Sequence, residues 1–172
     1  DNTVLISRED IPKCLFIGLI KSKIKPTIKL MKQIGHAMQE YEDTYEKYDK
    51  EKFVDFFNKK NNYNFDSHFY DSLNNAFMLY SRCKPNKNIA RVLEYLNTKY
   101  EVVALSNYLT EVQYNRLKKR DLAKYFKEIY GGDIVLKPNK EAYLKACGNH
   151  KIEECLFIGD SLANDYLGAE KY

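Results

Sequence analysis

The sequence contains few glycines and prolines, seven and four among 172 residues. Collagen-like, disordered and low-complexity chains are rich in one or both, so the composition does not fit these classes. Cysteines are also few: Cys14, Cys83, Cys147 and Cys155 stand far apart and form no Cys-x-x-Cys pair. This usage indicates reduced thiols, and we therefore expect a cytoplasmic protein.

No apolar run is long enough to cross a membrane. The run from Cys14 to Ile20 falls well short of the roughly 20 residues that a bilayer crossing needs. The first residues also lack the basic region, apolar run and cleavage site of a secretory signal. The net charge is +4, from 28 basic and 24 acidic residues, without a basic stripe interleaved with aromatics. We expect a soluble protein whose partners include neither membranes nor nucleic acid.

Residues 7–82 have the pattern of an all-helical domain. Apolar residues such as Ile24, Ile28 and Met31 recur at three- and four-residue spacing, which is the period of an amphipathic helix. Aromatic residues continue this stripe and supply large apolar surface for a core. They are Tyr41, Tyr45, Tyr48, Phe53, Phe56, Phe57, Phe69, Phe77 and Tyr80.

From residue 83 the pattern alternates between strand and helix. This alternation is typical of a parallel sheet that helices cover on both faces. We predict an α/β fold in which residues 1–6 and 83–172 form a Rossmann-like parallel-sheet core and residues 7–82 form an inserted helical domain. The predicted strands are 101–106, 128–131 and 155–158, and the predicted helices are 89–96, 110–126, 141–147 and 162–170.

Polar residues gather where the predicted strands end, which is where open parallel sheets bind their ligands. Carboxylates suit Mg²⁺, while a hydroxyl, an amide and an ammonium suit the oxygens of a phosphoryl group. The sequence therefore indicates a site for a phosphorylated ligand and a divalent cation. The residues are Asp1, Thr3, Ser106, Asn107, Lys137, Asp160 and Asp165.

Four segments resemble the motifs of the haloacid dehalogenase-like (HAD) hydrolase superfamily, in its phosphatase type with an inserted helical cap. Residues 1–3, Asp-Asn-Thr, are similar to the tail of the first motif, D-x-D-x-T. Residues 105–107, Leu-Ser-Asn, resemble the second motif, and Lys137-Pro138 resembles the third. Residues 159–169, Gly-Asp-Ser-Leu-Ala-Asn-Asp-Tyr-Leu-Gly-Ala, resemble G-D-S-x-x-x-D-x-x-G-A, the most specific of the four. The resemblance implies that residues 7–82 are the cap.

The resemblance also implies the catalytic and metal-binding residues. Asp1 matches the second aspartate of the first motif, which works as general acid and base, and this work demands a raised pKa. Lys137 neutralises the clustered carboxylates and the phosphate. Asp160 and Asp165 hold Mg²⁺, with help from the backbone carbonyl of Asp1. The alternative assignment of Asp1 as the nucleophile is less favoured, because ion-pumping ATPases with that arrangement carry Thr where this chain has Leu5.

The phosphate-binding residues implied by the resemblance are Ser106, Asn107 and Lys137. The Ser106 hydroxyl and the backbone N–H of Asn107 hydrogen-bond the phosphoryl oxygens. Lys-Pro-Asn-Lys occurs twice, at residues 84–87 and 137–140. Lys137 precedes the Gly-Asp-Ser segment by one helix and matches the motif, so we assign Lys84 to a hinge between cap and core.

The sequence departs from the family pattern at its ends. The nucleophilic aspartate, expected two positions before Asp1, is not in this sequence, so we expect a longer natural protein, with further residues at both ends. The predicted function is a Mg²⁺-dependent phosphohydrolase that acts on a small phosphorylated metabolite through an aspartyl-phosphate. The alternative is a non-catalytic phosphate- or metal-binding module, or an inactive fragment. A phosphomutase also stays open, whereas a dehalogenase is disfavoured because it does not need Asp1.

Overall fold

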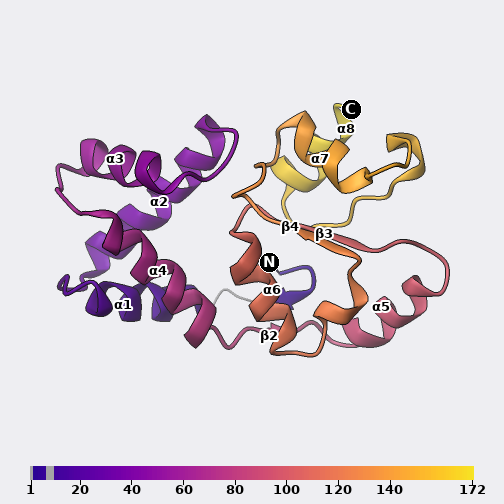
Figure 1. Cartoon of the computed structure of the whole chain (residues 1–172), viewed down its shortest axis with the longest axis horizontal. Helices are drawn as coiled ribbons and strands as arrows, with labels where there is room; N and C mark the ends of the chain where they lie inside the picture. The colour runs from indigo at the N-terminus through magenta and orange to yellow at the C-terminus, as the bar shows by residue number, and fades with distance from the viewer. Residues whose placement is uncertain (1, 7–9) are drawn as a thin grey trace.

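The computed structural model describes residues 2–6 and 10–172 (Figure 1). Its helices are α1 Asp10–Lys21, α2 Ile28–Thr44, α3 Lys50–Asn61, α4 Ser67–Tyr80, α5 Ile89–Asn97, α6 Thr110–Lys118, α7 Lys140–Cys147 and α8 Gly168–Glu170. The strands are β1 Leu5–Ile6, β2 Lys84–Pro85, β3 Val103–Leu105 and β4 Glu128–Tyr130. Shorter turns are η1 Ala123–Tyr125 and η2 Ile152–Glu154, both 3₁₀, and the π-helical η3 Leu162–Leu167.

Helices α1 to α4 lie together on one side of the molecule, and we call them the helical group (Figure 1). Three of them begin at a capping residue. The side chains of Thr27, Asp49 and Asp66 accept hydrogen bonds from backbone N–H groups in the first turns of α2, α3 and α4. Such bonds satisfy donors that have no partner inside a helix. The local sequence therefore fixes where these helices start.

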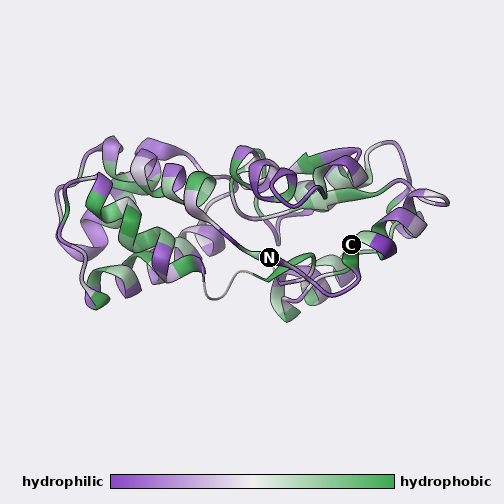
Figure 2. Ribbon diagram, turned by 90° about the horizontal axis from the view of Figure 1, so that it is seen from below, coloured by the Kyte–Doolittle hydropathy of each residue, from purple (hydrophilic) through white to green (hydrophobic). Residues whose placement is uncertain are grey.

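The aromatic stripe of the sequence forms the core of the helical group. Figure 2 shows hydrophobic segments along these helices. Tyr41 on α2 stacks on Tyr45 and Tyr48 and meets Phe53 of α3 edge-on. These rings combine burial of large apolar surface with the stacked and edge-on geometries that aromatic pairs prefer. Most of the predicted aromatics are buried or partly buried in this core, and Ile24 and Met31 pack against it. Ile28 and Tyr80, predicted on the same stripe, are instead 71% and 38% exposed.

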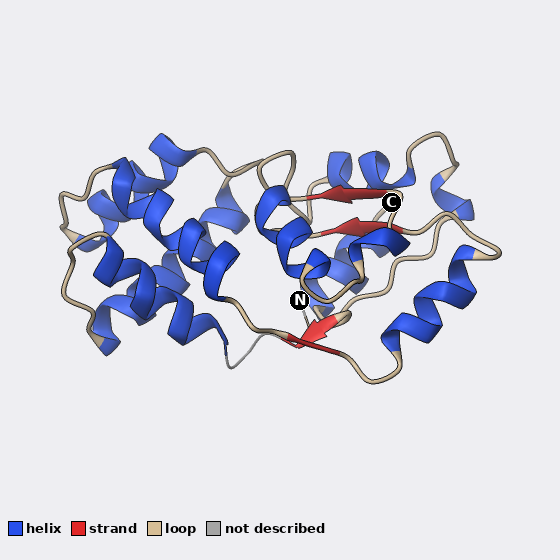
Figure 3. Ribbon diagram, turned by 60° about the horizontal axis from the view of Figure 1, so that its bottom comes forward, coloured by secondary structure: helices blue, strands red, loops and turns tan. Residues whose placement is uncertain are grey.

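The rest of the chain contains a small parallel sheet with helices around it (Figure 3). Strands β3 and β4 run parallel, with Val103 opposite Glu128 and Leu105 opposite Tyr130. This pair is the α/β arrangement that the alternating pattern predicted. A second, smaller core of Leu5, Cys83, Leu93, Leu117 and Leu122 packs beside it.

Residues 2–6, the described part of the segment predicted over 1–6, do not extend the parallel sheet. Strand β1 instead pairs antiparallel with β2, with Leu5 opposite Pro85 and Ile6 opposite Lys84. This short ribbon lies apart from β3 and β4 (Figure 3). Lys84, predicted as a hinge, therefore belongs to a strand that joins the two segments flanking the helical group.

Two sequence predictions are wrong in detail. Residues 155–158 form no strand: Leu156 and Ile158 are 84% and 68% exposed, and no strand within the described ranges pairs with them. An apolar run becomes a strand only beside a partner. The helix predicted over 110–126 ends at Lys118, because Asp121 adopts a left-handed conformation with φ 55° and Leu122 N–H bonds back to Leu117.

Along residues 2–6 and 10–172, no helix has both the length and the apolar character to cross a membrane.

Candidate active site

Ser106 directly follows β3, at the C-terminal end of that strand. Its backbone N–H donates to the carbonyl of Tyr130 at 2.9 Å, which continues the pairing with β4. Its Oγ accepts hydrogen bonds from the backbone N–H of Tyr108 at 3.1 Å and from Nε2 of Gln113 at 2.6 Å. A hydroxyl has two acceptor positions and one hydrogen, so these contacts leave the O–H to donate. The Ser106 hydroxyl can therefore donate its hydrogen to an anionic ligand.

Asn107 ties the segment after β3 to the segment that carries Lys137. Its Oδ1 accepts from the Lys137 backbone N–H at 2.8 Å, and its Nδ2 donates to the Lys137 carbonyl at 3.0 Å. No described residue accepts from the backbone N–H of Asn107. The side chain thus has a structural task, while the N–H predicted to bind phosphate stays available.

Lys137 and Asp165 form an ion pair between Nζ and Oδ1, with side chains only 12% and 14% exposed. The other carboxylate oxygen of Asp165 accepts from the Ser161 backbone N–H at 3.0 Å. Burial raises the pKa of Asp165, but the Lys137 ammonium and the Ser161 N–H outweigh it, so the pKa lies below its ordinary value. Asp165 is therefore held as a carboxylate.

Local sequence brings Asp165 into this position. A Cβ on Gly159 would collide with the carboxyl group of Asp165, so a glycine is needed there. Ser161 caps the following π-helical turn, because its Oγ accepts from the Asn164 N–H at 3.1 Å. The Tyr143 hydroxyl, on α7, donates to the carbonyl of Asn164 at 2.5 Å. The Gly-Asp-Ser turn is thus anchored to the helix that follows Lys137.

Asp160 lies at the exposed side of the same turn. Its Oδ2 accepts a hydrogen bond from Nδ2 of Asn2 at 3.1 Å, which brings the start of the chain to the Gly-Asp-Ser turn. Asp1, predicted as catalytic and metal-binding, lies outside the described residues. Within the described ranges no three acidic, His or Cys side chains form a metal-binding cluster. Asp160 and Asp165 nevertheless offer the hard oxygen ligands that Mg²⁺ takes, and the geometry of a complete metal site stays a prediction.

Glu42, on α2, reaches this site and was missed by the sequence analysis. Its Oε2 accepts from Nδ2 of Asn107 at 3.0 Å, and its Oε1 accepts from the Tyr48 hydroxyl at 2.8 Å. Burial raises its pKa even though both hydrogen bonds favour the carboxylate. No signal marks Glu42 in the sequence, because it is one of several acidic residues on an amphipathic helix.

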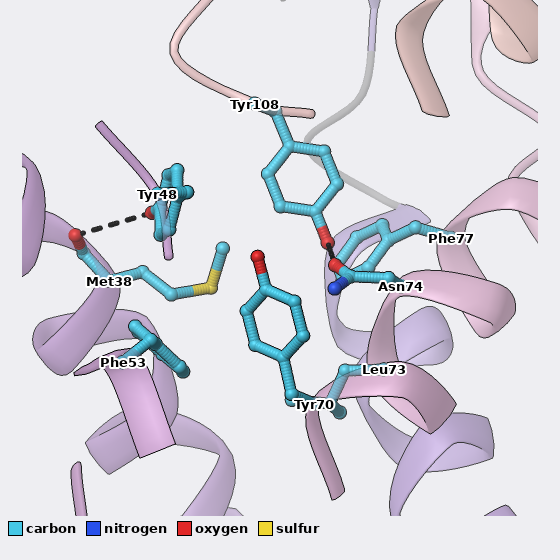
Figure 4. A pocket seen from close by; sticks show the side chains of 8 residues that line it. All are labelled: Met38, Tyr48, Phe53, Tyr70, Leu73, Asn74, Phe77 and Tyr108. Carbon is cyan, nitrogen blue, oxygen red and sulfur yellow. Dashed lines mark hydrogen bonds between the residues drawn. The ribbon is translucent and has the colours of Figure 1, made fainter. Parts of the chain in front are cut away.

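A small cavity adjoins this contact between the helical group and the segment after β3 (Figure 4). Its volume is about 10 Å³, which is close to the space that one water molecule needs. Two of its lining residues are bonded to each other, because the Tyr108 hydroxyl donates to Oδ1 of Asn74 at 2.6 Å. The cavity is mostly aromatic and apolar. Its lining residues are Met38, Tyr48, Phe53, Tyr70, Leu73, Asn74, Phe77 and Tyr108.

Ser106, Asn107, Lys137 and Asp165, all predicted from the sequence, are thus joined by sequence adjacency, hydrogen bonds and an ion pair. A family model of haloacid dehalogenase-like hydrolases matches residues 14–171. The chain belongs to the haloacid dehalogenase-like hydrolase family. This confirms the resemblance that the motifs indicated and, with the fold, the HAD-like α/β class.

Several HAD structures share the fold of the chain. The magnesium-bound HAD-hydrolase YfnB from Bacillus subtilis has a TM-score of 0.73 and 20% identity, covering 99% of this chain and 81% of that one. A predicted phosphoglycolate phosphatase from Haemophilus somnus has a TM-score of 0.69 and 19% identity, covering 98% and 76%.

A dehalogenase is also similar, with a TM-score of 0.62, 19% identity and coverage of 98% and 76%. No curated protein matches the chain in sequence. At these identities, structural similarity shows a shared fold only. The similar structures include both a predicted phosphatase and a dehalogenase. The reaction must therefore be argued from the site itself.

Proposed function

We propose that this HAD hydrolase is a Mg²⁺-dependent phosphohydrolase that acts on a small phosphorylated metabolite through an aspartyl-phosphate. The observation that carries the proposal is the connected set of Ser106, Asn107, Lys137 and Asp165. It combines a hydroxyl hydrogen, a backbone N–H and an ammonium beside a carboxylate. These donors match phosphoryl oxygens, and phosphoryl transfer depends mostly on such positioning and charge stabilisation.

Each residue has a defined task in this proposal, and some have more than one. The hydroxyl of Ser106, the N–H of Asn107 and the ammonium of Lys137 bind the phosphoryl oxygens. A nucleophilic aspartate two positions before Asp1 would attack phosphorus, and Asp1 would protonate the leaving oxygen and then take a proton from water. Lys137 also balances the carboxylate of Asp165.

Asp160 and Asp165, with Asp1, would hold Mg²⁺, which supplies a positive charge that neutralises the transferring group. The helical group serves as the cap over this site. We further propose that the protein is cytoplasmic and that its partner is a small phosphorylated molecule rather than nucleic acid or a membrane. A phosphomutase would use the same residues and differ only in the final acceptor.

The alternative is a non-catalytic phosphate- or metal-binding module, because the donors of Ser106, Asn107 and Lys137 would bind a phosphoryl group without a nucleophile beside them. Mass spectrometry of the natural protein distinguishes the two. An aspartate two residues before Asp1 favours the enzyme, and a native N-terminus at Asp1 favours the binding module.

The direct test is hydrolysis of a panel of phosphomonoesters, with Mg²⁺ or with a chelator, by the protein with whatever residues precede Asp1 in its gene. We expect Mg²⁺-dependent release of phosphate, reduced about 100-fold or more in Asp160→Asn. Asp55→Asn, at an exposed position on α3, serves as the matched control and should keep full activity. Absence of hydrolysis with Mg²⁺, or an unchanged rate in Asp160→Asn, would contradict the proposal.

A further inference from the structure

A series of buried hydrogen bonds runs from Ser106 into the protein interior. Nε2 of Gln113 donates to Ser106 Oγ at 2.6 Å, and Oε1 of Gln113 accepts from the Arg116 guanidinium at 2.9 Å. Nε of Arg116 donates to the Ser81 hydroxyl at 3.2 Å. Gln113 and Arg116 are only 6% and 3% exposed although both are polar. Polar groups buried to this degree are costly unless they are hydrogen-bonded, so their partners define their orientation.

Arg116 decides which way the amide of Gln113 faces. A guanidinium can only donate hydrogen bonds, so the group of Gln113 that faces it must be the carbonyl. The amide N–H₂ then faces Ser106 and can only donate. Ser106 receives this bond and the one from the Tyr108 N–H, so both of its acceptor positions are filled. Its hydrogen therefore points away from Gln113.

The far end of the series is anchored where the chain enters and leaves the helical group. The Ser81 hydroxyl donates to Oδ2 of Asp10 at 3.0 Å, and the Arg82 backbone N–H donates to the same oxygen at 2.6 Å. Asp10 begins α1, and Ser81 directly follows α4. Arg116 is thus fixed by contacts on both of its sides.

We propose that Gln113 is a positioning residue that turns the Ser106 hydroxyl hydrogen toward a phosphoryl oxygen. The inference rests on the proposed phosphate site. It gives α6 a role in the site, because the Gln113 amide and the Arg116 guanidinium on this helix orient the hydrogen of Ser106. A hydroxyl held as a donor binds an anion without first being reoriented.

The test replaces the donor group of Gln113 by an acceptor. Gln113→Glu keeps a carboxylate oxygen for Arg116 but has no N–H to give to Ser106. The Ser106 hydrogen then turns toward this carboxylate and away from the ligand. We expect binding of inorganic phosphate with Mg²⁺, measured by calorimetry, to weaken about 10-fold, and kcat/KM to fall about 100-fold. Gln39→Glu makes the same change on the exposed face of α2 and should alter neither quantity.

A double-mutant cycle with Ser106→Ala separates positioning from a general loss of structure. Without the hydroxyl, adding the uncharged Gln113→Met should change phosphate affinity by less than about 2-fold, whereas Gln113→Glu also adds a charge of the ligand's own sign. With Ser106 present, Gln113→Met removes the donor without drawing the Ser106 hydrogen away, so it should weaken phosphate binding less than Gln113→Glu does; it carries the test if Gln113→Glu does not fold.

The outcomes are distinct. If the unaltered protein binds no phosphate with Mg²⁺, both the proposed function and this inference are wrong. Equal phosphate affinity in the unaltered protein and Gln113→Glu would overturn the inference alone. The same holds if an effect of Gln113→Met on phosphate affinity persists without Ser106.

Discussion

At the scale of single residues, the ion pair of Lys137 and Asp165 joins segments 28 residues apart. The pair is largely buried, so each charge depends on the other for compensation. Removing one partner from such a pair leaves an uncompensated charge, which is more damaging than losing a surface pair. The pair should therefore contribute to the stability of the metal-free protein as well as to the site.

Replacing Lys137 by Met tests this. The pKa of Asp165 is below its ordinary value in the folded state, so its stabilisation is present above about pH 4 and is lost as pH falls through the folded value. We expect Lys137→Met to lose about 2 kcal/mol of unfolding free energy at pH 7. Burial then raises the pKa of Asp165, so acidification should destabilise this variant less than the unaltered protein.

The measurement is urea unfolding of the metal-free protein at pH 7 and pH 3. Lys124→Met is the control, because its pair with Asp121 is exposed and its loss should have no measurable effect. If Lys137→Met and the unaltered protein lose stability equally on acidification, the assigned role of the pair is wrong.

At the scale of elements, the turn after β4 packs closely against the segment after β3. Gly132 has no room for a side chain: a Cβ there would lie 2.6 Å from Leu136 Cδ2 and 2.9 Å from the carbonyl carbon of Asn107. The Tyr48 backbone N–H also donates to the Gly132 carbonyl at 2.6 Å. A Cβ added to Gly35, in the middle of α2, would have no other atom within 4 Å.

The two glycines predict opposite effects of one substitution. Gly132→Ala forces the backbone of Asn107 to move and should destabilise the protein by about 1–3 kcal/mol. Gly35→Ala removes backbone freedom from the unfolded chain and should stabilise by about 0.5–1 kcal/mol. Urea unfolding of both variants checks the signs. A neutral Gly132→Ala would show that the turn does not hold Asn107 in place.

At the scale of the whole molecule, the helical group and the sheet meet at the candidate site. Glu42 places a carboxylate on the Asn107 amide, next to a cavity of about 10 Å³. Ser106, Asn107, Lys137 and Asp165 do not line this cavity, so it is separate from the proposed phosphate site. We infer that the leaving group of a phosphate ester bound beside Asn107 would approach Glu42, where like charges brought together are unfavourable.

We therefore expect Glu42 to disfavour leaving groups that carry a negative charge. Glu42→Gln removes the charge and keeps the shape, and it should raise kcat/KM for 2-phosphoglycolate, relative to glycerol phosphate, about 10-fold. Asp43→Asn removes a charge from the exposed neighbouring position and should leave this ratio unchanged. An equal ratio in the unaltered protein and in Glu42→Gln would exclude this role.

The sequence by itself determined the helices of the first half, the alternation of the second and the chemistry of the motifs. Capping residues, spacing of apolar side chains and the types of residue at strand ends are local properties, and they identified Ser106, Asn107, Lys137 and Asp165. The predicted roles of these residues, and of Asp1 and Asp160, stay predictions until they are tested by mutation.

Only the tertiary structure decided which distant groups meet. Glu42 and Gln113 have no marked spacing, because their role comes from Asn107, Ser106 and Arg116 across the fold. Residues 155–158 have the apolar character of a strand but pair with no described strand. Pairing and burial depend on the whole chain, and no local pattern contains them.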